Sequence, residues 1–480
     1  MAHALLRAAS PLLATPGRLI YGARKGAGTP GLKTCATRAV KLQLMRLALC
    51  GLVVLALSAV VLADRLEDTF YVPLDDPAIQ YAAPASDPIA HLQKQLEAQK
   101  IKLDYAPNGW GYLPAVLKQL NIHIDSQVLV FSRTSIQTSH ISPRTPRAIY
   151  FNDDTAVGFV QNGEVLELSA IDPRQGAVFY SLDTEKTDRP EFARRDDCLR
   201  CHQGAPTMGI PGIMVSSVHP VTDAEARESH GSAFITDGRT SFEERWGGWY
   251  VTGTHGSQVH LGNNPELTDP LNPGRALKEG TQNVTSLADR FNTSRYLAPT
   301  SDIVALMTLE HQTRMSNLMT RIGWDARIAL REGKGTLDSA ARERINTEIE
   351  EMVGYMLFAD AEPLKEPVKG VSTFTKTFAE RGPRDAKGRS LRDFDLQKRL
   401  FRYPVSYMIY SAAFDGMPDL VRELVYQQLY DFLTGKDKGF VEFSRLAGLS
   451  AADRQVALEI LRATKPNLPK YWLSSPAVVN

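Results

Sequence analysis

The chain of 480 residues has few cysteines, and its first 63 residues contain no aspartate or glutamate. Of the four cysteines, Cys35 and Cys50 lie in this acid-free segment, so the rest of the chain keeps only Cys198 and Cys201. A structural zinc site built on one such pair needs two more Cys or His ligands at short spacing. Only the single histidines His219 and His230 lie nearby, which makes zinc a weak alternative.

The chain also lacks a basic excess, an internal repeat and a low-complexity tract. Its formal net charge of +1 includes eight basic residues within positions 1–63. Residues 64–480 therefore hold 47 Lys and Arg against 54 Asp and Glu, a net charge of −7. Binding to phosphate groups requires a basic field, so we expect no nucleic-acid partner.

An apolar run follows the basic N-terminal segment. It extends over residues 47–63, is interrupted only by Gly51 and Ser58, and ends in a small residue before Asp64. A basic flank, an apolar run and a small residue at its exit predict a secretory signal. The run has 17 residues, at the lower limit for a membrane span, so an uncleaved anchor is the alternative. We expect the body outside the cytoplasm, in the periplasm, either soluble or anchored to the inner membrane by residues 47–63.

Cys198 and Cys201 belong to the pentapeptide Cys198-Leu199-Arg200-Cys201-His202. Two cysteines at this spacing with a histidine directly after the second form the attachment pattern of c-type haem: each thiol adds to a vinyl group, and the histidine binds iron. A redox dithiol is disfavoured, because polar residues 194–197 precede the pair where such a site follows a strand. We expect one covalent haem c at Cys198 and Cys201, with His202 as the proximal ligand.

Seven segments from Gln127 onward carry a resemblance to a known family: Gln127–Ser132, Pro143–Asp154, Asp172–Tyr180, Cys198–His202, Arg245–Gly256, Glu310–Met315 and Leu391–Asp395. In these segments the chain resembles the large single-haem bacterial cytochrome c domain-containing proteins. The resemblance implies haem, a periplasmic location and electron transfer, without a defined substrate.

The sixth iron ligand decides whether a haem passes electrons or binds small molecules. The candidates are His255, His260 and His311. Each has a competing interpretation: His311 as a core histidine between methionines, His255 as a turn residue or a propionate partner, and the pair of His255 and His260 as a separate metal site.

Three further residues, Arg245, Trp246 and Trp249, are candidates for the haem rim, or alternatively for a packed bend under the sheet. Glu310 is a possible proton donor in a peroxidase-like site. Because neighbouring helical residues point about 100° apart, Glu310 and His311 are not expected to face one iron together.

The pattern of apolar residues predicts an α+β fold, with an antiparallel β-meander flanking the haem motif and a mainly helical C-terminal part. We divide the chain into an export signal or membrane anchor (1–63), a linker with short helices (64–126), a β-rich region with the haem motif (127–298) and a helical region (299–480). Strands are expected at 128–132, 148–151, 156–160, 164–171 and 177–182, then at 213–218, 232–236 and 249–252. Helices are expected at 301–322, 325–331, 338–358, 396–412, 418–433, 438–446 and 451–464, with an exposed excursion at 361–390.

These features predict an exported single-haem c-type cytochrome that transfers one electron at a time to a redox partner protein. Two alternatives stay open. One is a haem enzyme, a peroxidase or oxidase with an open distal site, and the other is a haem-bearing subunit that docks on a larger respiratory assembly. The acidic body would favour a basic redox partner, although the same charge also serves solubility alone.

Overall fold

The computed structural model describes residues 72–218, 234–265, 279–436 and 449–473, all of which belong to one compact unit, Glu67–Asn480. The expected export segment (1–63) and the expected helix at 438–446 lie outside the described residues. Within the described ranges, no helix is both long and apolar enough to cross a membrane.

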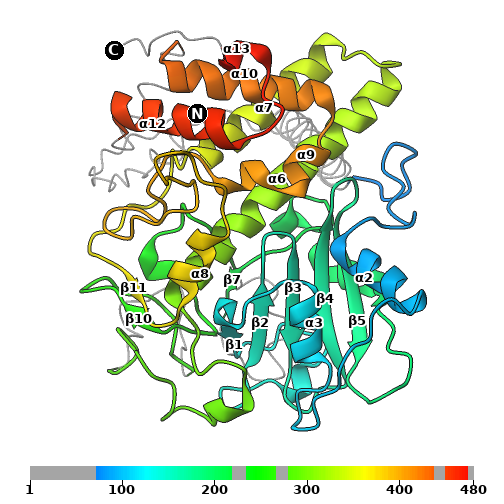
Figure 1. Cartoon of the computed structure of the whole chain (residues 1–480), viewed down its shortest axis with the longest axis vertical. Coiled ribbons are helices and arrows are strands. Elements are labelled where there is room, and N and C mark those ends of the chain that lie inside the picture. The colour runs from blue at the N-terminus through cyan, green and yellow to red at the C-terminus, as the bar shows by residue number, and fades with distance from the viewer. Residues whose placement is uncertain (1–71, 219–233, 266–278, 437–448, 474–480) are drawn as a thin grey trace, which may run out of the picture. The chain divides into compact units, whose positions relative to one another are not determined.

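A seven-stranded antiparallel sheet forms the centre of the fold, in the order β6-β5-β4-β3-β2-β1-β9 (Figure 1). The chain runs back and forth through the first six strands, so the predicted α+β class and β-meander are confirmed. Asn162, at a positive φ of 57°, and Gly163 lie in the turn between β3 and β4, and Asn-Gly is a dipeptide typical of such hairpin turns. The strands are β1 (Val128–Val130), β2 (Arg147–Phe151), β3 (Thr155–Phe159), β4 (Val165–Asp172), β5 (Gly176–Asp183), β6 (Ala193–Arg194) and β9 (Trp249–Tyr250).

Helices α2 (Pro88–Glu97) and α3 (Leu113–Gln119) lie beside the sheet (Figure 1). Asp87 caps α2 and also accepts a hydrogen bond of 2.5 Å from the Tyr180 hydroxyl of β5. In the preceding segment, Ile79 is fully buried and the Tyr81 hydroxyl donates to the Ala177 carbonyl. From residue 72 onward this part of the predicted linker with short helices (64–126) therefore packs into the core.

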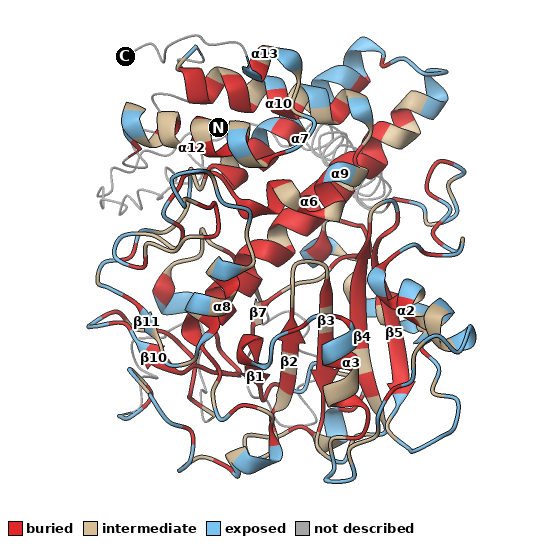
Figure 2. Cartoon of the chain, in the orientation of Figure 1, coloured by how far each residue is buried: buried red, intermediate tan, exposed pale blue. Residues whose placement is uncertain are grey.

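The long helix α6 (Ile303–Glu332) begins at the buried cap Asp302 and packs along the sheet. Most of its residues are buried (Figure 2). We expected Gly323 to divide it into two helices, and this is wrong. Burial on several sides stabilises the helix by more than one interior glycine costs, about 1 kcal/mol.

The C-terminal part is helical, as predicted. The helices expected at 338–358, 418–433 and 451–464 are confirmed as α7 (Ser339–Met356), α10 (Asp419–Thr434) and α12 (Ala451–Thr464). The helix expected at 396–412 is wrong: Pro404 interrupts it, leaving one 3₁₀ turn, η7 (Tyr407–Tyr410). The excursion at 361–390 contains α8 (Phe374–Glu380), which buries Phe374 and Phe378, so it is not simply exposed. The described residues of this part also form α9 (Ala412–Gly416) and α13 (Lys470–Leu473).

Short elements connect these parts. The strand expected at 213–218 is shorter, β7 (Ser216–Ser217). It pairs with β8 (Phe234–Ile235), which lies in the strand expected at 232–236, whose first two residues are outside the described ranges. The pair β10 (Gly253–Thr254) and β11 (Lys369–Gly370) joins the loop after β9 to the C-terminal part. Single helical turns are η1 (Ile124–Ser126), η2 (Thr138–His140), η3 (Asp196–Cys198), α4 (Leu199–His202), η4 (Ala205–Thr207), η5 (Phe242–Glu244) and η6 (Thr293–Arg295).

Candidate functional site

The segment Cys198–His202 forms a short helical turn directly after the edge strand β6. The Arg195 amide donates to the Phe179 carbonyl of β5, and the Arg195 guanidinium holds the Asp197 carboxylate at 2.8 and 3.0 Å. The chain then enters η3 and α4, where the Gln203 amide closes the last turn on the Leu199 carbonyl. The pentapeptide is thus anchored to the sheet at its N-terminal end.

His202 is half-buried, and its ring is held in one orientation. Its Nδ1 lies 2.9 Å from the Gly212 carbonyl oxygen, and its ring centroid lies 4.8 Å from that of Phe179. A carbonyl can only accept, so Nδ1 carries the proton and the lone pair of the neutral ring is at Nε2. Burial lowers the pKa of His202, which keeps the ring neutral at physiological pH. No hydrogen bond to Nε2 is found among the described residues, and a free Nε2 is what a metal ligand requires.

The loop after His202 returns to it. The Gly212 amide donates to the His202 carbonyl at 2.9 Å, and the Thr207 hydroxyl donates to the carbonyls of Ile210 and His202. The side-chain amide of Asn317 on α6 pairs with both backbone groups of Ile213. Contacts with α6 therefore hold the loop that carries the Gly212 carbonyl, the acceptor of the hydrogen bond from the His202 ring.

The two thiols differ in exposure. Both are free: Cys198 is half-buried against the core and Cys201 is exposed. Burial, followed by the charge of Asp197, raises the pKa of Cys198 to about 11. Reactive dithiols of oxidoreductases have a lowered thiol pKa, so this environment does not resemble theirs.

The two loop histidines, His255 and His260, are buried beside each other, with ring centroids 4.8 Å apart, against Phe242. The Nε2 of His255 accepts from the Asn283 amide, and the Nδ1 of His260 accepts from the Gly262 amide. Burial lowers both pKa values, and that of His260 lies well below its usual value. Neither ring contacts the Cys198–His202 turn among the described interactions.

His311 lies in the middle of α6, within an aromatic cluster. Its ring stacks on Tyr355 at 5.2 Å and also contacts Phe358 and Phe401. Its Nε2 lies 2.7 Å from the Ser406 hydroxyl, and burial lowers its pKa to about 3. This environment is that of a core histidine with a satisfied ring. In the described ranges, no group of three or more His, Cys, Asp or Glu side chains could hold a metal ion.

The three candidates for the haem rim, Arg245, Trp246 and Trp249, are buried in the interior. Arg245 and Trp246 both contact the buried Glu310 on α6, at 3.3 Å (Nη1 to Oε2) and 2.9 Å (Nε1 to Oε1). Burial raises the pKa of Glu310 to about 7, although Arg245 opposes it. The indole of Trp249 donates to the Ser216 carbonyl. These contacts join the bend after η5 to α6, which favours the packing interpretation.

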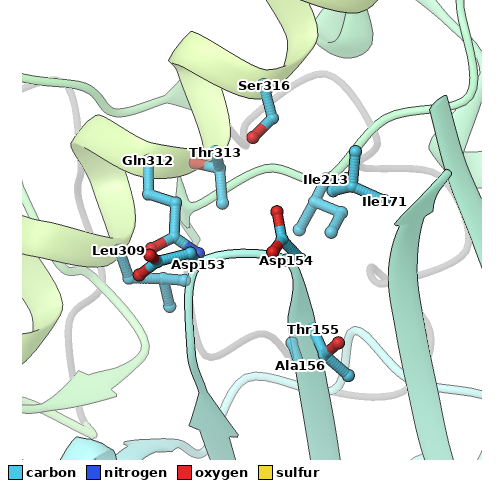
Figure 3. Close-up of a pocket in the computed structure, with 10 residues that line it drawn as sticks. All are labelled: Asp153, Asp154, Thr155, Ala156, Ile171, Ile213, Leu309, Gln312, Thr313 and Ser316. Carbon is cyan, nitrogen blue, oxygen red and sulfur yellow. The ribbon is translucent and has the colours of Figure 1, made fainter. Parts of the chain in front are cut away.

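One small cavity lies between α6 and the end of the sheet (Figure 3). It leaves about 10 Å³ for the centre of a water molecule, which is space for about one water and far less than a porphyrin needs. Burial, followed by Asp153, raises the pKa of the Asp154 carboxyl group that lines it to about 6. The sequence gives no sign of this carboxyl group, because Asp153 and Asp154 lie in the short connection between the strands expected at 148–151 and 156–160.

Sequence reasoning also missed a polar cluster on the sheet, formed by Arg147, Glu167, Ser135 and Gln137. The Arg147 guanidinium pairs with Glu167 at 2.9 Å, while Ser135 and Gln137 donate to the other carboxylate oxygen at 2.5 and 2.9 Å. Although burial acts in the opposite direction, Arg147 and these donors hold the pKa of Glu167 below its usual value. No pattern in the sequence connects these four positions.

Comparisons with known proteins add no relative: no family model, no curated protein and no solved structure matches this chain.

Proposed function

We propose that this protein is an exported single-haem c-type cytochrome that transfers one electron at a time. The observation that best supports this proposal is the environment of His202. Its Nδ1 donates to the Gly212 carbonyl, its ring lies on Phe179, and its Nε2 is left for a ligand, while the free thiols of Cys198 and Cys201 precede it in the same helical turn.

The residues present fit a covalently attached haem. Cys198 and Cys201 would form thioether bonds, and His202 would bind the iron through Nε2. When bound, the haem supplies an iron that cycles between two oxidation states. The hydrogen bond from Nδ1 to Gly212 fixes the tautomer and the direction of the ring, and it increases the basicity of the ligand.

Export and partner choice belong to the same proposal. Residues 1–63 would direct the chain across the inner membrane, and the body would work in the periplasm, soluble or held by residues 47–63. The net charge of −7 on residues 64–480 would favour a basic redox partner protein.

A haem enzyme with an open distal site is the second candidate. It is favoured by the positions of the three candidate ligands, His255, His260 and His311. They make other contacts, and no interaction within the described part of the chain links them to the Cys198–His202 turn. An iron without a sixth protein ligand binds small molecules such as oxygen or peroxide.

The test is expression of the full chain in a bacterium that has the machinery for cytochrome maturation. We expect a red protein whose mass exceeds the polypeptide by one haem that resists acid extraction, and whose double variant Cys198→Ala/Cys201→Ala is colourless. A colourless wild-type protein with the mass of the bare chain would refute the proposal. Carbon monoxide added to the reduced protein then separates the two candidates: binding favours the enzyme, and an unchanged spectrum favours electron transfer.

A further inference from the structure

The cluster around Glu167 lies on the same face of the sheet as the His202 ring. Phe179 of β5, which the ring contacts, is opposite Ser169 of β4. Because side chains in a strand alternate between faces, Glu167 is on the same face as Ser169, two residues along the same strand. Glu167 is therefore about one strand and two residues away from Phe179, roughly 8 Å between Cα atoms from ordinary sheet spacings.

A second connection runs through the segment that precedes the cysteines. Glu167 is opposite Ser181 in the β4–β5 pairing, and the Ser181 hydroxyl accepts a bond of 3.4 Å from Arg195. Arg195 in turn holds Asp197, the residue before Cys198.

The side chains of Arg147 and Glu167 meet across a glycine of the sheet, where no side chain separates them. Gly158 of β3 lies between Arg147 and Glu167, and a Cβ there would lie 3.7 Å from Arg147 Cδ and 3.5 Å from Glu167 Cβ. The two side chains thus meet above β3, and their side chains are only 16% and 19% exposed. In such a place a charge is screened less by solvent than on an open surface.

We propose that Arg147 and Glu167 set the reduction potential of the haem attached at Cys198 and Cys201, an inference that rests on the proposed function. Reduction adds one negative charge to the iron centre. A nearby carboxylate disfavours that charge and lowers the potential, whereas a nearby guanidinium favours it and raises the potential. The two residues are positioning groups that act through the electrostatic field, and they do not take part in bonding to the iron.

The test is a double-mutant cycle on the haem-loaded full chain, read as the midpoint potential at pH 7 by spectroelectrochemistry. Glu167→Gln leaves Arg147 uncompensated, so the potential should rise. Arg147→Gln leaves a carboxylate that Ser135 and Gln137 still bind, so the potential should fall. The variant with both changes should lie between the two single variants.

The matched control is Asp385→Asn. Asp385 pairs with Arg389 at 2.6 Å with similarly low exposure, but this pair belongs to the C-terminal part and also binds Glu459 of α12. It should leave the potential unchanged. Equal potentials in the four members of the cycle, or a shift in Asp385→Asn as large as in Glu167→Gln, would overturn the inference.

A second readout uses the haem-free chain. In Glu167→Gln, the pH profile for alkylation of Cys198 should move to lower pH, because a negative charge near the thiol has been removed. An unmoved profile would place Glu167 too far away to act. Failure of the proposed function is seen separately, since in that case the wild-type chain carries no haem at all.

Discussion

Gly212→Ala gives a sharp test of the loop that fixes His202. An added Cβ at this position would lie 2.5 Å from Asn317 Oδ1, 2.9 Å from its Cγ and 2.9 Å from Thr207 Cβ. The Asn317 amide cannot turn away without giving up its two hydrogen bonds to Ile213, at 2.8 and 3.1 Å. Overpacking costs about 1–3 kcal/mol and each lost hydrogen bond about 1 kcal/mol. If Asn317 moves away, the steric strain falls but its hydrogen bonds are lost, so the two costs do not add in full. We therefore expect the free energy of unfolding to fall by about 2–3 kcal/mol.

The assay is urea unfolding of the full chain followed by circular dichroism, with Gly354→Ala as the control. Gly354 lies inside α7, and no atom comes within 4 Å of a Cβ built there. The same substitution should therefore stabilise the protein by about 0.5–1 kcal/mol, through the better helix propensity of alanine. If Gly212→Ala were as stable as the wild type, the packing of this loop against α6 would not be what fixes the Gly212 carbonyl.

Three further outcomes are expected. Because burial raises the pKa of Glu310 from 4.5 to about 7, the folded protein keeps a proton that the unfolded chain releases, so stability should fall as the pH rises from about 4.5 to 7. In Glu310→Gln, urea unfolding at pH 5 and pH 8 should show a smaller fall, and an equal fall would contradict this account. His311→Gln should lower the free energy of unfolding by more than about 1 kcal/mol, because it removes the contact with Ser406 and the aromatic packing. The visible spectrum of the haem-loaded protein should not change, and an altered spectrum would indicate that His311 is an iron ligand. In the haem-free chain, iodoacetamide should modify exposed Cys201 faster than half-buried Cys198, as peptide masses would report, and the reverse order would be inconsistent with the raised pKa of Cys198.

The strands before the motif could be predicted because their information is local. Alternating apolar residues with a turn at Asn162 and Gly163 specify both the strands and their order. The prediction of an exposed excursion at 361–390 was wrong because the structure of this segment depends on a distant contact. Its position depends on Asp302, whose carboxylate accepts from the amides of Val371 and Ser372, some 70 residues away. Its Pro, Gly and Lys content indicates a loop, but it carries no sign of this long-range anchor.

The candidate site likewise has a local part, which the sequence predicts, and a part that depends on contacts between distant segments. The proposed attachment of haem is predicted from a single stretch of sequence, by the spacing of Cys198, Cys201 and His202. The groups around it come from β2, β4, β5 and α6, whose mutual positions follow from the strand pairing. Glu167 alternates with apolar residues in a strand, and this pattern indicates only a side chain on one face of the sheet. Its proximity to the motif becomes visible only once the register of β4 with β5 is known.

The three histidines predicted as candidate sixth ligands show what residue type alone leaves undecided. Each was selected because imidazole binds iron, but a ring nitrogen binds a metal only if the fold leaves its lone pair free. At His255, His260 and His311 a hydrogen bond already engages one nitrogen, and the rings lie among other aromatic residues. At His202 the engaged nitrogen is Nδ1, held by a backbone carbonyl, which is the arrangement that leaves Nε2 available. The difference lies in the role of the engaged nitrogen. At His202 it donates to a carbonyl, which leaves the lone pair on the other nitrogen, whereas at His255 and His260 it accepts from a backbone amide and its lone pair is used. The position of the Gly212 carbonyl depends on the return of the loop from Gln203 to Gly212 and on its contacts with α6.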